Sequence, residues 1–552
     1  MEQLGIAMGE RAGAFAVWLS NPITQLVFAP LLGSILIMLT NRKRTALIKL
    51  WAILGSGLSL LAAILMVTGL PEMLTRLSLF EQYGAPFRPE VGLQFAQEYS
   101  WFRIVLGEAQ SFSVNYAVAV DGLSMPLVLM ASAVIFLAVV WSIGRTERVR
   151  DYFALTLLMA TGLLGVFVAL DYVLFYLFWE LMLVPMFFLI AGWGPNRARA
   201  GKAAIKFFIY TMAGSVFMLI AFIALKVLSL EPTFSIISLT QYHLLNFDVL
   251  HPTVRTLIFC GLLLGFAVKI PMFPFHTWLP DAHTEAPTEM SVILAAVMLK
   301  TGAYAYLRIL YPTFPDVAYT LGPVLAFCGV VAIVYGAAVT LVQTDLKRLV
   351  AYSSISHMGF IVLGISALNP DAFVGAVFQM VAHGIVISTL FFLCGVIERR
   401  YGTRNLHELG GLLSGAPSYA TVLGVAAFAG MGLPGLVSFW GEFLVLKGTF
   451  FNNENWASVQ VGVMDASRFM QIAAIVAVLG VLGSAVYMIN MLQRVLPGED
   501  KLSEFWRGFK FADGVVLVPL TAAIVVLGLY PRPVIDSCIY YANALWQTVM
   551  QF

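Results

Sequence analysis

The stretch Lys269-Ile-Pro-Met-Phe-Pro274 interrupts a run of apolar residues that begins near residue 253. Proline has no backbone N–H and restricts the residue before it, so two prolines in so short a segment break a helix. A second long apolar run is interrupted by Gly432-Leu-Pro-Gly435. The sequence therefore predicts two broken helices, the seventh and the twelfth, each inside a segment long enough to cross a membrane.

The composition of the chain indicates a membrane protein. Hydrophobic residues make up 60% and charged residues 11% of the 552 residues, and the mean hydropathy is +0.88. A typical soluble domain carries roughly 25% charged residues. The expected fold class is therefore an all-α polytopic membrane protein, and the net charge of +2 says little about its partners.

Hydrophobic segments give the number of helices. About 20 mostly apolar residues are needed to cross a bilayer as a helix. By this criterion the sequence predicts fourteen transmembrane helices, over residues 22–40, 47–70, 118–143, 152–170, 172–192, 203–229, 253–275, 288–311, 319–342, 347–366, 372–398, 418–450, 470–494 and 513–530. The long extramembrane stretch from Pro71 to Tyr116 is not expected to be a separate domain. The tail from Pro531 to Phe552 is expected to be amphipathic or interfacial.

The two broken helices suggest an internal repeat. They are five helices apart, and an odd offset gives them opposite orientations, as in an inverted repeat with ion sites at the breaks. The predicted organisation is N-terminal helices and an extracytoplasmic loop in 1–115, a third helix in 116–151, a first five-helix repeat in 152–311, an inverted second repeat in 319–494, and a C-terminal helix and tail in 495–552. The eleventh helix, with Gly375 and Gly384 around His383, is expected to be a third irregular helix.

The distribution of basic residues predicts the orientation. Nineteen Lys and Arg residues, Lys347 among them, are assigned to loops after odd-numbered helices. The opposite side receives only eight, namely Arg11, Arg76, Arg88, Arg103, Arg255, Arg308, Arg468 and Arg532. Positive charge marks the cytoplasmic side, so both termini are expected on the extracytoplasmic side of a bacterial cytoplasmic (inner) membrane. Met1 to Ser20 show no cleavable signal pattern.

Six ionisable side chains lie near the middle of long apolar segments: Glu180, Lys269, Lys300, His357, His383 and Glu442. Each such residue costs about 2.5–3.5 kcal/mol on insertion scales, so it is rarely retained without a use. The default interpretation is an ion or proton site, and six residues at one depth suggest a conduction path along the membrane.

Three of these residues suggest the first part of that path. Lys269 lies just before a helix break, where unsatisfied carbonyls and water can solvate it, and Glu180 is its natural partner. The alternative is a static buried ion pair that fixes helix packing. Lys300 is central in its span and has no carboxylate within one helical turn, so snorkelling to an interface cannot explain it.

The other three suggest the second part. His357 and His383 suit a proton relay because the ordinary pKa of histidine is near physiological pH; the alternative is that they are hydrogen-bonded packing residues. Glu442 follows the second break and is expected to be a terminal proton acceptor. Its alternative role is a carboxylate that caps the half-helix.

Polar residues also follow the first break. His276, Asp281, His283 and Glu285 form a possible proton entrance toward Lys269. A metal site is a weaker interpretation because their spacing fits no metal-ligand signature. The four cysteines, Cys260, Cys328, Cys394 and Cys538, are far apart and are expected to be buried thiols without a ligand or disulfide role.

The motifs together resemble a known family. The matching segments are Trp179-Glu180 through Pro185, Lys269 through Pro287, Asp345 through Gly359, and Gly432 through Glu442. They are similar to the antiporter-like subunits of NADH:quinone oxidoreductase, respiratory complex I, over roughly residues 115–495. The resemblance departs at Thr288-Glu289-Met290, where the family usually has a small, uncharged segment. Glu289 either adds a carboxylate to the proton entrance or favours the helix N-terminus.

The resemblance carries further expectations. Glutamate at 442 and the short chain after the fourteenth helix resemble the subunit M branch, the counterpart of mitochondrial subunit 4, whereas subunits L and N place lysine there. It implies a proton-translocating subunit with Glu180 and Lys269 as a coupled pair, Lys300 as the central relay and Glu442 as the exit. It also implies neighbouring subunits L and N and lipids as partners, no nucleic acid, and no cofactor or redox centre in this chain. NADH, FMN, iron–sulfur clusters and quinone are expected in partner subunits.

Two alternatives of the same fold remain open. The first is a subunit of an Mrp-type Na⁺/H⁺ antiporter, which would use the Glu180–Lys269 pair without redox input; glutamate at 442 argues mildly against it. The second is a subunit of a membrane-bound hydrogenase, which would share the antiporter-like core. A purely structural membrane scaffold is opposed by the charges at mid-membrane depth.

Overall fold

The computed structural model describes residues 21–68, 92–106, 110–451, 456, 460–461, 464–498 and 509–550. Among these residues, thirteen helices are long and apolar enough to cross a membrane. The all-α polytopic fold class is thereby confirmed. The N-terminal segment Met1 to Ser20 and residues 71–91 of the predicted extramembrane stretch lie outside the described residues. So do the basic residues Arg11, Arg76, Arg88, Lys501 and Arg507.

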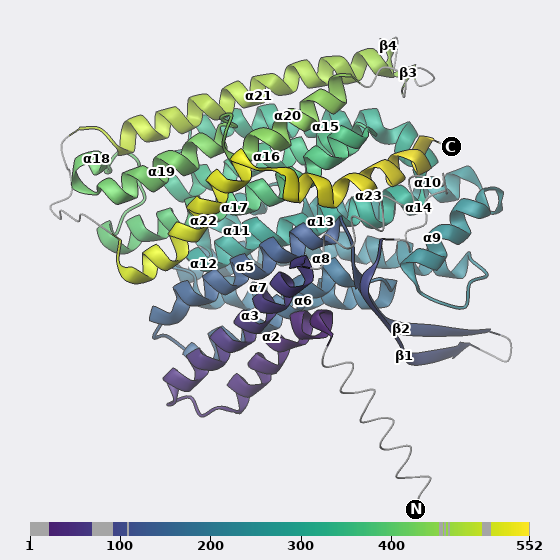
Figure 1. Cartoon of the computed structure of the whole chain (residues 1–552), viewed down its shortest axis with the longest axis horizontal. Helices are drawn as coiled ribbons and strands as arrows, with labels where there is room; N and C mark the ends of the chain where they lie inside the picture. The colour runs from purple at the N-terminus through teal and green to yellow at the C-terminus, as the bar shows by residue number, and fades with distance from the viewer. Residues whose placement is uncertain are drawn as a thin grey trace, which may run out of the picture.

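The first half of the bundle contains eight of the thirteen spans. Its helices are α2 (Pro22–Leu39), α3 (Thr45–Thr68), α5 (Ser124–Trp141), α6 (Val149–Val168), α7 (Tyr172–Trp193), α8 (Arg197–Val227), α9 (Ile236–Leu245), α10 (Pro252–Lys269) and α11 (Leu279–Glu285), followed by the composite helix 288–313. The short helices α9 and α11 are not spans. Figure 1 shows α2 and α3 side by side at one edge of the bundle, where they pack on α5 and α6.

The second half has long helices around a second broken one. Its elements are α15 (Pro315–Leu341), α16 (Leu346–Ser366), α17 (Pro370–Tyr401), α18 (Leu412–Gly415), α19 (Pro417–Gly430), α20 (Val437–Phe450), α21 (Ala466–Val495), α22 (Phe511–Leu529) and α23 (Arg532–Met550), with a two-stranded turn, β3 (Gln460–Val461) and β4 (Met464–Asp465). Polar side chains begin several of these helices; Asp345 and Asn369, for example, accept backbone N–H groups of α16 and α17.

Both predicted breaks are present. Helix α10 ends at Lys269 and the chain resumes as α11 at Leu279. The predicted helix 418–450 is divided into α19 and α20, and Gly432 and Gly435 between them have φ values of +73° and +91°. Only glycine adopts such angles readily, which explains why this break contains glycine as well as proline. The twelfth predicted helix is thus a pair of half-helices, in addition to the thirteen spans.

The irregularity expected in the eleventh helix is instead in the eighth. Helix α17 is continuous over 32 residues, so the expectation based on Gly375 and Gly384 was wrong. These glycines allow close contact with neighbouring helices: a Cβ on Gly375 would lie 2.6 Å from the backbone nitrogen of Val445. The segment 288–313 contains two π-helical turns, Leu294–Met298 and Tyr306–Leu310, between α12 (Thr288–Ile293), α13 (Leu299–Ala305) and α14 (Tyr311–Thr313).

A β-hairpin lies at the end of the predicted extramembrane stretch, before the third predicted helix. Strands β1 (Gln94–Leu106) and β2 (Gln110–Val120) are antiparallel, with Gln94 opposite Val120. Figure 1 shows the hairpin extending away from the helices. Its base is attached to the bundle, because the N–H of Leu170 donates to the carbonyl of Ala117 at 2.9 Å.

Several basic residues assigned to loops are buried within helices. Arg255 is 1% exposed and pairs with Asp316 at 2.6 Å, and Arg308 pairs with buried Asp121 at the same distance. Lys347 is also 1% exposed. These residues were wrongly counted as loop charges; a nearby carboxylate or carbonyl makes their burial tolerable.

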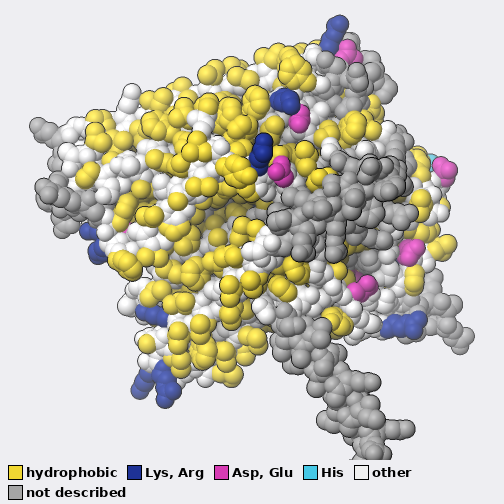
Figure 2. Space-filling view, in the orientation of Figure 1, with side chains coloured by type: hydrophobic (Ala, Val, Ile, Leu, Met, Phe, Trp, Pro, Cys, Tyr) yellow, Lys and Arg dark blue, Asp and Glu magenta, His cyan; other side chains and the backbone are white. Residues whose placement is uncertain are grey.

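The outer surface of the bundle is apolar. Figure 2 shows hydrophobic side chains over most of one face, with Lys, Arg, Asp and Glu side chains mainly toward its edges. The C-terminal helix α23 runs along the bundle in Figure 1, and its Tyr541 hydroxyl donates to the carbonyl of Leu307 at 2.8 Å. The predicted amphipathic tail is therefore a helix fixed to the second π-helical turn of segment 288–313.

Candidate functional site

Lys300 lies in the centre of the bundle and is fully buried. Its ammonium group, Nζ, is 2.7 Å from the carbonyl of Ala295 and 2.6 Å from Nδ1 of His383. Ala295 belongs to the π-helical turn before α13, and such turns change the i→i−4 pairing so that a carbonyl can face a side chain. Among the described residues no ion pair joins Lys300 to a carboxylate. Its partners are thus a carbonyl dipole and an imidazole.

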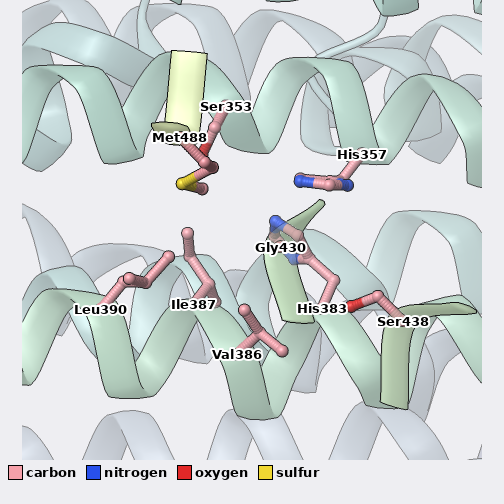
Figure 3. A pocket seen from close by; sticks show the side chains of 9 residues that line it. All are labelled: Ser353, His357, His383, Val386, Ile387, Leu390, Gly430, Ser438 and Met488. Carbon is pink, nitrogen blue, oxygen red and sulfur yellow. The ribbon is translucent and has the colours of Figure 1, made fainter. Parts of the chain in front are cut away.

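The two histidines face each other between α16 and α17. The ring centroids of His357 and His383 are 5.5 Å apart, and Figure 3 shows the two side chains on opposite sides of a small space. This cavity, about 10 Å³ in volume, is lined by Ser353, Ser438, Gly430 and Met488 among others. That volume is close to the minimum that holds one water molecule. Nε2 of His383 is buried and has no hydrogen-bond partner in the described part of the chain.

The carboxylate of Glu442 contacts the imidazole of His357. Its Oε1 atom is 3.1 Å from Nδ1 of His357 and accepts a hydrogen bond of 3.3 Å from Nε2 of Gln379. Its other oxygen lies against the break, since a Cβ on Gly432 would be 2.5 Å from Oε2. The hydroxyl of Tyr487 on α21 is 3.5 Å from Nε2 of His357. Lys300, His383, His357 and Glu442 therefore form one buried row, with a single gap between the two imidazoles.

Lys269 and Glu180 lie apart from this row. Lys269 is the last residue of α10, where unpaired carbonyls favour a cation. Its Nζ atom has no hydrogen-bond partner among the described residues and lies 5.2 Å from the centre of the Trp179 ring. Glu180 is half-buried and interacts electrostatically with Lys269. Its Oε1 atom and Lys269 Nζ have no hydrogen-bond partner among the described residues. The pair expected from the sequence is thus close without direct contact.

The predicted entrance residues do not form one cluster. Three of them contact separate neighbours near α8 and α15. His276 stacks on Phe273 with a centroid separation of 5.6 Å and contacts Tyr335 edge-on. Asp281 pairs with Lys206 at 2.7 Å, and Glu285 pairs with Arg199 at 3.5 Å.

His283 and Glu289 are both buried and lie apart from those three residues. His283 is 0% exposed and stacks on Phe391 with a centroid separation of 5.0 Å. Glu289 forms an ion pair with Arg145 and accepts a hydrogen bond of 2.6 Å from the hydroxyl of Tyr152. The structure thus gives Glu289 a buried partner as well as a position in the first turn of α12.

Sequence reasoning missed two polar neighbours of the row. Gln379 precedes His383 by four residues, so both side chains lie on one face of α17, and that spacing could have indicated it. Tyr487 carries no comparable signal, because a tyrosine in an apolar helix is common. Within the described residues no group of three or more His, Cys, Asp or Glu side chains is arranged to hold a metal ion.

Comparison with known proteins identifies the family. The family model described as NADH:quinone oxidoreductase/Mrp antiporter, TM, matches residues 169–467. The chain is 38% identical over 440 residues to NADH-quinone oxidoreductase subunit M of Pseudomonas aeruginosa, covering 79% of this chain and 82% of the relative. It is also 38% identical over 434 residues to subunit M of Escherichia coli K12, covering 77% and 81%.

Solved structures agree with this assignment. A chain of respiratory complex I from Thermus thermophilus with bound NADH superposes with a TM-score of 0.77 and 27% identity, covering 95% of this chain and 99% of that one. A chain of the Mrp complex from Dietzia sp. DQ12-45-1b has a TM-score of 0.76 at 18% identity, covering 96% and 99%, and shares the fold. The chain therefore belongs to the NADH:quinone oxidoreductase/Mrp antiporter family of membrane proteins, and within it to the subunit M group.

Proposed function

We propose that this chain is a proton-translocating membrane subunit of NADH:quinone oxidoreductase, and that its protons move along the buried row of ionisable residues. The observation that carries this proposal is the direct contact of Lys300 with His383 and of His357 with Glu442. Such contacts are short enough for proton transfer between side chains, and the cavity between the imidazoles has room for about one bridging water.

The path begins at Lys269 and ends beyond Glu442. Protons enter from the cytoplasmic side past His276, Asp281, His283, Glu285 and Glu289. They then pass Lys269, Lys300, His383 and His357. Glu180 acts on Lys269 through space, so a change in the charge of either residue alters the other's affinity for a proton. Moving one charge outward against 100 mV costs about 2.3 kcal/mol, so the row must be driven.

The energy comes from redox chemistry in other subunits. NADH, FMN, iron–sulfur clusters and quinone are bound by those partners, and the present chain contributes no redox centre. Subunits L and N are the proposed neighbours, in contact with the apolar outer surface together with lipids. The proposed setting is a bacterial cytoplasmic membrane with both termini on the extracytoplasmic side. The proposed division into repeats is 152–311 and 319–494.

The decisive experiment compares inverted membrane vesicles from wild type and a Glu180→Gln strain. Vesicles that still oxidise NADH with a hydrophilic electron acceptor but lose most NADH-driven acidification support the pump. The amide keeps the size of the carboxylate but carries no charge, so the electrostatic link to Lys269 is removed. Unchanged NADH-driven acidification, with loss of Na⁺-dependent dissipation of an imposed pH gradient, would assign the chain to the antiporters.

A further inference from the structure

An open cavity of about 350 Å³ lies on the outer face of helix α8. Its lining residues are Lys202, Ile205, Lys206, Ile209 and Tyr210. They are related by steps of three and four positions, so they share one face of the helix. The lining atoms are almost all apolar, because lysine packs its hydrocarbon stem along apolar surface and keeps its ammonium group in a polar environment. The cavity thus has apolar walls with ammonium groups at its edge.

The length of α8 places this cavity at one edge of the membrane. The helix has 31 residues, or about 46 Å at 1.5 Å per residue, whereas the hydrocarbon core is about 30 Å thick. The exposed side chains in its C-terminal half are apolar, for example Ile220 at 59% and Val227 at 69%. About 20 residues cross the core, so the crossing part extends from Val227 back to about Phe208. Lys202 and Lys206 therefore lie at the depth of the lipid headgroups.

The two lysines at the cavity differ in their partners. Lys206 donates from Nζ to the carboxylate of Asp281 and to the carbonyl of Thr277, both at 2.7 Å. Lys202 is exposed, and it forms no ion pair or side-chain hydrogen bond with any described residue. The charge of Lys206 is thus balanced by the protein, whereas the charge of Lys202 is not. The edge of the apolar cavity carries one positive charge that a ligand can neutralise.

We propose that this cavity binds an anionic phospholipid, with the lipid phosphate at Lys202 and an acyl chain against Ile205 and Ile209. A phospholipid matches both properties of the site, because it joins a negative headgroup to an apolar chain. A basic residue near the membrane surface favours anionic lipid by about fivefold. The ring of Tyr210 completes the site, and aromatic rings of this kind are enriched at the level of the headgroups. The proposal goes beyond the proposed function and does not depend on proton translocation.

The competing occupant of this face is a neighbouring protein subunit. A subunit packed over the cavity would bury the ammonium group of Lys202. An unpaired buried charge is costly, so that subunit would have to bring its own carboxylate to this point. A lipid supplies the opposite charge and the apolar chain in one molecule, at the depth where lipid headgroups already lie. Charge and depth together therefore favour the lipid.

The test places a photoreactive residue in the cavity of the assembled complex. Ile209→p-benzoylphenylalanine is suitable because Ile209 is 59% exposed, so the larger side chain has room. The purified complex is reconstituted in vesicles of equal amounts of phosphatidylglycerol and phosphatidylcholine, irradiated, and analysed by mass spectrometry for the molecule attached at position 209. We expect about fivefold more phosphatidylglycerol than phosphatidylcholine. This preference should disappear in Lys202→Gln and persist in Lys202→Arg, because arginine keeps the charge.

Arg197→Gln is the matched control for a general effect of surface charge. Arg197 lies at the same end of α8, but it does not line the cavity and it pairs with Glu147 at 3.3 Å. This variant should keep the wild-type preference. If the complex with the photoreactive residue at 209 does not assemble, Ile205→p-benzoylphenylalanine gives the same measurement, since Ile205 is 52% exposed.

Three results would overturn the proposal. The first is equal attachment of the two lipids in wild type. The second is an undiminished preference for phosphatidylglycerol in Lys202→Gln, which would mean that Lys202 does not hold the headgroup. The third is attachment to a neighbouring subunit in place of lipid, which would show that protein covers this face of α8.

Discussion

Lys300 Nζ and His383 Nδ1 are 2.6 Å apart, although the two residues are 83 positions apart in the chain. The contact is possible because a carbonyl of the π-helical turn, that of Ala295, takes a second bond from the same ammonium group. A lysine and a histidine that both carried charge would repel at this distance. The pair therefore shares a proton more readily than it holds two, which suits a relay.

Lys300→Met is expected to abolish proton translocation through this subunit while the fold persists. Methionine is unbranched and adaptable, so it fills the buried space without an ionisable group. The measurement is NADH-driven acidification of inverted vesicles, with helix content followed by circular dichroism of the purified complex. An unchanged number of protons moved per NADH would contradict the relay role.

Glu442→Gln is expected to block the exit while keeping the local contacts. The amide oxygen can still face His357 and Gln379, but the group cannot take up a proton. Acidification should fall strongly, whereas the amount of assembled complex should not change. Tyr487→Phe is the comparison variant, because it removes only a long contact of 3.5 Å to His357. A loss in Tyr487→Phe equal to that in Glu442→Gln would argue that packing around His357 is the cause.

Arg308→Met is expected to destabilise the chain. Arg308 and Asp121 are each 5% exposed and 2.6 Å apart, and Asp121 also accepts the backbone N–H groups of Leu123 and Ser124. Removing one partner of a buried pair typically costs about 3–5 kcal/mol because the other charge is left buried. The solubilised complex should lose this subunit at a lower temperature. The double variant with Asp121→Asn should be less damaged; equal damage would show that the unpaired charge is not the reason.

Asp171 is expected to make stability depend on pH. It lies outside the spans, at the start of α7, where it accepts the N–H groups of Val173 and Asn115. Burial outweighs these bonds and raises its pKa from 3.8 to about 6. The folded form therefore binds a proton more tightly than the unfolded form. The resulting stability is present below pH 3.8 and is lost as the pH rises to about 6.

The check is thermal unfolding of wild type and Asp171→Asn across this pH range. Asparagine does not titrate. The difference in unfolding midpoint between wild type and Asp171→Asn should therefore change between about pH 4 and pH 6 and become constant at higher pH. A difference that stays constant from pH 4 to pH 7 would show that the pKa of Asp171 is not raised.

Some features of the site depend only on a short segment of the sequence, and these features were predicted correctly. The prolines after Lys269 and the glycines around Pro434 predicted both breaks, because backbone geometry at these residues excludes a regular helix. The burial cost of a charge singled out Lys300 and Glu442. No such rule marks the π-helical turns of 288–313, whose cause lies in packing against neighbours.

Ion pairs and hydrogen bonds between residues far apart in the chain could not be predicted from the sequence. The pairing of Glu289 with Arg145 joins residues 144 positions apart. Lys347 appeared to be a loop charge by its place beside Arg348, yet it is buried under the turn that contains Ala286. In both cases the sequence shows a charge near a helix end, and only the fold shows what covers it.

The sequence by itself determined the membrane class and both helix breaks, and it singled out six ionisable residues within apolar segments, because hydropathy and backbone restriction act over short stretches of chain. The tertiary structure decided the order of contact, from Lys300 to His383 and from His357 to Glu442, and it left Lys269 and Glu180 outside that row. These distances depend on how α10, α13, α16, α17 and α20 pack, and helix packing arises from side chains that are far apart in the sequence.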